Sequence, residues 1–176
     1  KVMSNEIQSI YDQIDRNNQT IKSFLISEGI SEDEISISVP VISDKYANEY
    51  GNNDRPYRYI ASSVITVCTG KIDKVLTLMS KQSELLKKGV VTGGNTWDNP
   101  VQFKYEGLNE IKPEMIEEAT KNAREVADKF AKDSGSKLGK IKTASQGTFT
   151  IEDRDSNTPE IKKIRVVTSV TYYLKN

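Results

Sequence analysis

Two stretches of this sequence share the same order of elements: an amphipathic helix pattern, then a glycine, then residues with strand character. The first stretch has apolar residues at three- and four-residue spacing over residues 4–28 and ends at Gly29. The second, about 60 residues later, spans residues 72–88 and ends at Gly89. Glycine suits the left-handed conformation that terminates many helices. This repeat predicts a split βαβ pair and limits the fold more than any other feature of the sequence.

Between and after these helices the residues alternate in polarity, as strands do. Residues 34–42 predict a strand with one buried face, and residues 57–69 predict a longer strand whose C-terminal half is apolar on both faces. We expect that half to be covered on both sides or paired in an assembly. A further strand is expected at residues 101–105, after a turn-rich loop. The face predicted to be buried in the first of these strands consists of Ile35, Ile37, Val39 and Val41.

A third helix and two more strands complete the pattern. Pro113 is expected at the first turn of this helix, where a missing N–H costs no hydrogen bond, and the helix extends to about Ser134, before Gly135. Strands are predicted at residues 140–151 and 163–174. The predicted inner face of the helix consists of Met115, Ile116, Ala119, Ala123, Val126, Ala127, Phe130 and Ala131.

These elements together predict an α+β fold, with helices packed on a mostly antiparallel sheet. Residues 1–107 would form the split βαβ pair (βαββαβ), with residues 1–3 as the remnant of its first strand, and residues 108–176 would add an αββ extension. A chain of 176 residues can build its own hydrophobic core. We therefore assign residues 1–176 to a single domain.

The composition excludes several functions. The chain contains no histidine, so it has no Ser/His or Cys/His nucleophile pair, no imidazole base and no histidine-ligated metal. Its 25 basic and 25 acidic residues balance, which leaves no long-range field to attract a phosphate backbone. No apolar run approaches the ~18 residues of a membrane span. We expect no catalytic, cofactor or metal site, no nucleic-acid partner and no membrane span.

Two features resemble reactive or metal-binding sites. Asp153, Asp155 and Asn157 resemble the start of a calcium loop, but Thr158 and Ile164 occupy the positions that need glycine and glutamate, which favours a solvated hairpin tip. Cys68, the only cysteine, could act as a redox sensor only if its thiol were exposed. Its place at the end of an apolar strand predicts structural burial instead.

Large aromatic residues on polar loops are the remaining candidates for contact with a partner or ligand, because such residues are enriched at interfaces. The alternative is local packing of each loop against its own sheet. The polar residues 43–56 predict a hairpin loop or flap, and residues 92–100 a second turn-rich loop. The candidate contact residues are Tyr46, Tyr50, Tyr57, Tyr59 and Trp97.

Three phrases of the sequence resemble the SIMPL-domain family of bacterial envelope proteins. They are SEGISEDEI at residues 27–35, YRYIASSVITV at residues 57–67 and, after an alanine-rich helix, SGSKLGKI at residues 134–141. The resemblance covers about residues 6–173. The sequence departs from the family in its opening strand, which is reduced to residues 1–3, and in the Gly93-Gly94 loop that carries Trp97.

The resemblance implies a protein of the periplasm or outer cell envelope, made from a precursor with a signal peptide or lipid anchor. Family members are often oligomeric and have been associated with envelope and oxidative stress. The family offers no shared catalytic residues to carry over. At the helix exit it implies structural roles only: Gly135 permits the left-handed turn, and Gly139 lets the following strand start close to its neighbour.

Three hypotheses follow. The leading one is a non-enzymatic envelope protein that acts through self-association, as a homo-oligomer, or through contact with another envelope protein. The alternative is a periplasmic binding module that holds a small ligand or an extended peptide at a sheet edge or beneath residues 43–56. A deep apolar pocket under Tyr57 and Tyr59 would favour binding over assembly. The third is a hydrolase that uses two carboxylates alone.

Overall fold

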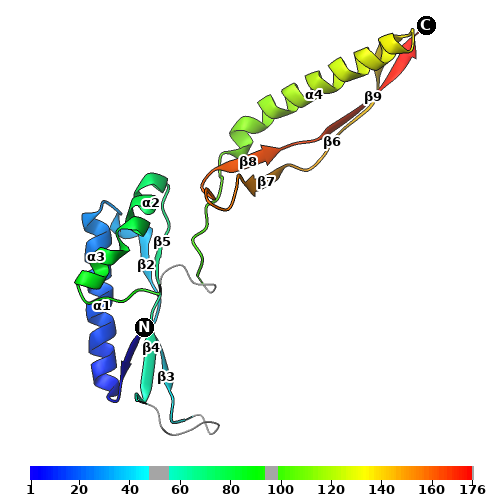
Figure 1. The fold of residues 1–176 in the computed structure, drawn as a ribbon. Coiled ribbons are helices and arrows are strands. Elements are labelled where there is room, and N and C mark those ends of the chain that lie inside the picture. The colour runs from blue at the N-terminus through cyan, green and yellow to red at the C-terminus, as the bar shows by residue number, and fades with distance from the viewer. Residues whose placement is uncertain (48–55, 94–98, 176) are drawn as a thin grey trace. The chain divides into compact units, whose positions relative to one another are not determined.

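The computed structural model describes residues 1–47, 56–93 and 99–175 of the chain (Figure 1). It has helices and small antiparallel sheets, which confirms the predicted α+β fold. The chain forms two compact units, Lys1–Pro100 and Val101–Asn176, and each is described by itself below.

The first unit contains a three-stranded antiparallel sheet in the order β1-β4-β3, formed by Val2–Ser4, Tyr59–Ser62 and Val41–Asp44. The helix α1 (Ile7–Ser27) connects β1 to a short 3-10 turn, Glu32–Glu34. A second ladder pairs β2 (Ile35–Ile37) with β5 (Ile65–Val67), and α2 (Ile72–Ser80) and α3 (Gln82–Lys87) follow. Because β1 and β3 both run antiparallel to the β4 strand between them, they are parallel to each other, as in a split βαβ unit.

Two clusters of buried side chains hold this unit together, and α1 contributes to both. The sheet-side cluster contains Ile10 and Ile14 of α1, and the other contains Phe24 of α1. Between them lies Asn18, which is buried and accepts a hydrogen bond from Ser63 Oγ at 2.8 Å. The remaining members are Val2, Ala61, Ile42 and Tyr59 in the first cluster and Leu85, Val90, Ile21 and Leu78 in the second.

The strand predicted at residues 34–42 is two strands, and its predicted buried face was wrong at Ile37, Val39 and Val41. Their side chains are 40%, 84% and 69% exposed, whereas Ile42 packs on the sheet-side cluster. The partners of β2 and of β3 differ by one residue in register, with the change at residues 38–40. A one-residue shift moves every following side chain to the opposite face.

The strand predicted at residues 57–69 also divides, into β4 and β5, and Cys68 lies just beyond β5. Its thiol is free and exposed, so the prediction of burial was wrong. Along this segment Thr66 and Cys68 are exposed, while the alternate residues Ile65 and Val67 are half-buried. The small β2–β5 ladder therefore leaves the Thr66 side of β5 open to solvent.

Two further predictions, for residues 72–88 and 101–105, differ from the structure. The predicted helix over residues 72–88 is interrupted at Lys81, which separates α2 from α3. The strand expected at residues 101–105 is absent: residues 100–106, all of them described, form no strand or helix. A strand exists only where a neighbouring strand accepts its hydrogen bonds, and alternation in the sequence does not supply that neighbour.

The second unit places one long helix against a two-stranded ribbon. The helix is α4 (Leu108–Asp133), and it contacts both β6 (Lys137–Gln146) and β9 (Thr168–Lys175), which pair antiparallel (Figure 1). A shorter ladder pairs β7 (Thr150–Asp153) with β8 (Lys162–Arg165). The helix begins five residues before Pro113, so that proline lies inside it rather than at its first turn as predicted.

The inner face of α4 is narrower than its sequence predicts. The alanines of the predicted face are half-buried, and Ala131 is 1% exposed, but Val126 and Phe130 are 51% and 71% exposed. Their predicted burial was wrong because these two residues flank the stripe that continues through Ala123 and Ala127. The expected close approach at Gly139 is confirmed, since a Cβ there would lie 2.5 Å from the carbonyl oxygen of Tyr173.

Candidate functional site

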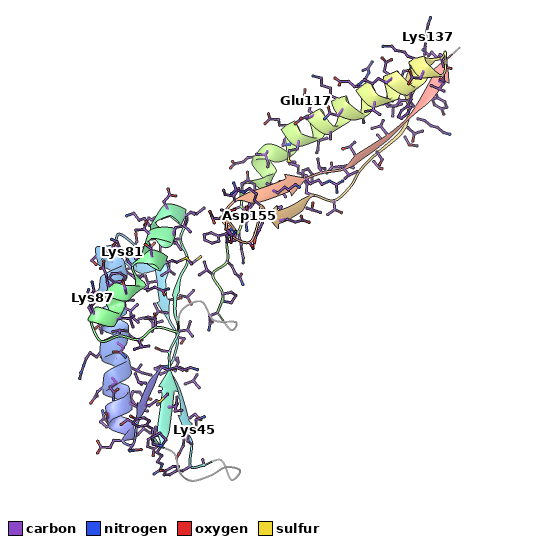
Figure 2. The ribbon with its side chains drawn as sticks, viewed as in Figure 1. Lys45, Lys81, Lys87, Glu117, Lys137 and Asp155 are labelled. Atoms are coloured by element: carbon purple, nitrogen blue, oxygen red, sulfur yellow. The ribbon has the colours of Figure 1, made fainter. Side chains whose placement is uncertain are left out.

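Aromatic residues and one arginine gather where the β3–β4 hairpin leads into residues 48–55. Asp44, the last residue of β3, lies opposite Tyr59, the first residue of β4. The guanidinium of Arg58 lies over two rings, with its Cζ 4.9 Å from the centroid of Tyr59 and 5.8 Å from that of Tyr46. Figure 2 shows Lys45 at this end of the hairpin. We call Asp44, Tyr46, Arg58 and Tyr59 the arginine–tyrosine cluster.

Hydrogen bonds fix the arginine at the centre of this cluster. Its Nη2 donates to Asp44 Oδ2 at 2.9 Å, and its Nε lies 3.2 and 3.3 Å from the two carboxylate oxygens. The bonds from Arg58, together with the backbone N–H of Tyr46, hold the pKa of Asp44 below its usual value. The Arg58 amide donates to Asn5 Oδ1 at 2.9 Å. A planar guanidinium held by two carboxylate oxygens and two rings has little freedom to rotate.

The cluster brings together two of the five candidate contact residues and leaves a third beside them. Tyr46 is 51% exposed and Tyr57 is 45% exposed, so both offer aromatic surface. Tyr59 differs, because its ring packs against the sheet-side hydrophobic cluster. Tyr50 and Trp97 lie outside the residues that the structure describes.

A second polar network joins the connection after α1 to the connection after β5. Glu34 accepts hydrogen bonds from Thr69 Oγ1 at 2.7 Å, from Lys71 Nζ at 2.7 Å and from the Ser31 amide at 2.8 Å. These donors, with Lys71 first, lower the pKa of Glu34 to about 2. A carboxyl group with so low a pKa carries no proton at neutral pH, so it cannot act as a general acid there.

The chain matches, over residues 1–172, the family described as SIMPL, a protein of unknown function (DUF541). The chain belongs to the SIMPL family. This confirms the resemblance found in the sequence. A comparison with curated proteins finds no significant match.

Two cavities of this SIMPL protein are lined by residues other than the candidate tyrosines. One, of about 150 Å³, is lined by Glu28, just after α1, and by Asp73, Lys74 and Thr77 of α2. The other, of about 390 Å³, lies between β1, α1 and the turn after α3. Neither of these two cavities is lined by Tyr57 or Tyr59.

The calcium-like segment of the SIMPL chain forms a hairpin turn whose carboxylates bind within the turn. Asp155 Oδ1 accepts the amides of Asn157 and Thr158, both at 2.9 Å, and Oδ2 accepts from Thr158 Oγ1 and Arg154 Nε. These bonds lower the pKa of Asp155 to about 2. Asp153 pairs with Lys162. Within the described part of the chain, no group of three or more acidic or cysteine side chains is placed to hold a metal ion.

The described helices include none that is long and apolar enough to cross a lipid bilayer. Sequence reasoning about the SIMPL chain found the tyrosines of the cluster but not Arg58 or Asp44. The signal available was the order Tyr57-Arg58-Tyr59 at a strand start, which places the arginine next to Tyr59, one of the two rings that it covers. No pattern in the sequence indicates the ion pair between Glu34 and Lys71, because the two residues are distant in the sequence.

Proposed function

We propose that this SIMPL protein acts in the bacterial cell envelope through self-association and catalyses no reaction. The observation that carries the proposal is the ladder of β6 and β9. It has ten residues in one strand and eight in the other, and within the described chain neither strand has a second partner. Unpaired strand edges present rows of N–H and C=O groups that pair readily with another chain.

The side chains of this ladder support the same proposal. Ile141 is 51% exposed, and Tyr173 and Leu174 are 55% and 58% exposed. In the described part of the second unit only Ala131 belongs to the buried core. Two strands and one helix bury little apolar surface alone, and association with a second copy would cover more of it.

The arginine–tyrosine cluster offers a further contact surface in the first unit. Tyrosine and arginine are the residues that most often dominate the binding energy of interfaces. Because Asp44 already holds Arg58, little side-chain entropy would be lost when a partner covers the cluster. This supports protein contact over local packing for Tyr46, while Tyr59 also serves the core.

The carboxylates support a role without catalysis. The two that are least exposed among the ion pairs, Glu34 and Glu28, are bound by Lys71 and Lys81 at 2.7 Å. An acid–base pair needs one carboxyl group with a raised pKa, whereas the shifted acidic groups of the described chain are all lowered. The envelope location and a role in envelope or oxidative stress rest on the family resemblance alone.

Light scattering coupled to size-exclusion chromatography, over a range of protein concentrations, tests the proposal. We expect a mass above that of one chain, and an I141K variant should shift the equilibrium toward the monomer by placing a charge on the exposed face of β6. The control is N122K, which adds the same charge at an exposed position of α4. A strict monomer at every concentration would contradict self-association.

A further inference from the structure

The sheet of the first unit has three strands of a four-strand pattern. In a split βαβ pair the strand after the second helix lies beside the first strand, antiparallel to it. Here β1, β4 and β3 correspond to the first, third and second strands of that pattern. Among the described residues β1 pairs with β4 alone. The outer edge of β1 is therefore the position of the fourth strand, and no described strand occupies it.

A cavity of about 390 Å³ lies along this edge. It is lined by residues 1–3, by side chains of α1 that include Arg16, and by Gly89 and Val91 after α3. The charged residues of its lining, Lys1 and Arg16, are both basic. An extended segment that ends in an acidic residue would match the shape and the charge of this edge.

Residues 103–106 of the same sequence have these properties. They read Phe-Lys-Tyr-Glu, with aromatic residues at alternate positions and an acidic residue at the end. The structure describes them without a strand, and Lys104, Tyr105 and Glu106 are exposed. Resting on the self-association proposed above, we propose that residues 103–106 of a second copy add to the outer edge of β1 as an antiparallel fourth strand.

Burial and charge select one register for this pairing. Val2 is 8% exposed and packs with the sheet-side cluster, while Met3 is 48% exposed on the other face. With Tyr105 opposite Val2, both aromatic residues of the added strand face that cluster and Lys104 lies opposite Met3 on the solvent face. The same register places Glu106 opposite Lys1. A shift of one residue would turn Lys104 toward the core.

Disulfide crosslinking in trans tests the pairing and its register. In a C68S background, which removes the exposed thiol, one chain carries M3C and a second chain carries K104C. Directly opposed strand residues have Cβ atoms about 4.5–5.5 Å apart, near the reach of a disulfide. Mixing the two chains under mild oxidation should give a covalent heterodimer. The matched control is M3C with Q102C, a diagonal pair at about 7–8 Å, which should crosslink several-fold less.

Charge exchange gives a second measurement. E106K should lower the yield of the M3C–K104C heterodimer, and the added K1E should restore it. Equal yields for the two cysteine pairs, or a crosslink formed only when M3C and K104C share one chain, would overturn the proposal. Light scattering on the same samples separates the two ideas: an oligomer without this crosslink contradicts the strand addition alone, and a monomer contradicts self-association as well.

Discussion

Lys71 binds Glu34 across the two connections that flank the β2–β5 ladder. Its Nζ lies 2.7 Å from Glu34 Oε2, 3.1 Å from Ser31 Oγ and 3.4 Å from the Gly29 carbonyl oxygen. The ammonium group thus contacts Gly29, two residues beyond α1, as well as the 3-10 turn. A positive charge near a helix C-terminus is favourable, because the last carbonyl groups of a helix carry partial negative charge.

Replacing Glu34 by glutamine should destabilise the protein at neutral pH but not in strong acid. The folded chain lowers the pKa of Glu34 from 4.5 to about 2, so the carboxylate contributes stability that is present above pH 4.5 and is lost as the pH falls toward 2. Melting curves of E34Q and the parent chain should therefore converge between these two pH values. E152Q, at an exposed carboxylate of β7, is the control, and an equal effect of both substitutions would contradict the prediction.

Replacing Arg58 should weaken self-association while leaving the secondary structure intact. R58K keeps the charge but loses the planar group that binds Asp44 through two nitrogens and lies over two rings, so it should behave like R58A. Light scattering gives the association and far-UV circular dichroism gives the fold. R124A, at an exposed site of α4, should change neither. Full association of R58A would exclude the arginine–tyrosine cluster from the interface.

Leu85 and Leu86 are neighbours on α3 that should differ sharply in importance. Leu85 is 5% exposed and packs with Phe24 and Val90, so L85A should lower the free energy of unfolding by about 2–5 kcal/mol. Leu86 is 56% exposed, and L86A should change it by about 0.5 kcal/mol or less. Urea denaturation measures both. Similar losses for the two variants would mean that a second surface covers Leu86.

Alanine substitutions at three glycines should distinguish the cost of a steric clash from the cost of backbone strain. At Gly139 a methyl group would meet the Tyr173 carbonyl oxygen at 2.5 Å, so G139A should cost about 2 kcal/mol or more by parting β6 from β9. Gly135 has a φ of 72° and open space around it, so G135A should cost about 1 kcal/mol from strain alone. G70A, with neither feature, is the control. Thermal unfolding should show the largest loss of stability for G139A, a smaller loss for G135A and the smallest for G70A.

The C-terminal ends of the helices could be predicted from sequence because their causes are local, whereas the start of α4 and the break at Lys81 were predicted wrongly. The apolar spacing of α1 and α4 follows the helical period, and Gly29, Gly89 and Gly135 all have positive φ, as the terminating role predicts. The strands and their pairing were harder to predict. The register change at residues 38–40 adds one residue between two ladders, and alternation before and after it gives no sign of the change.

The candidate site was predictable only in part, because it too depends on the register of a strand pair. Residue type alone pointed to Tyr46 and Tyr57, since exposed tyrosine is common at interfaces. The pairing of Arg58 with Asp44 depends on the hairpin register, which places Asp44 opposite Tyr59. An error of one residue in that register would move Asp44 to the other face of the sheet.

The partly buried hydrogen bond between Ser63 Oγ and Asn18 lies at a border within the first unit. On one side α1 packs on the β1-β4-β3 sheet through Ile10 and Ile14, and on the other side it packs on α3 through Phe24. Two apolar clusters joined by a polar contact can unfold separately, as two cooperative units of one chain. Amide hydrogens of β4 and of α3 should then exchange with solvent at independent rates, and a partner that adds to β1 would slow only the first.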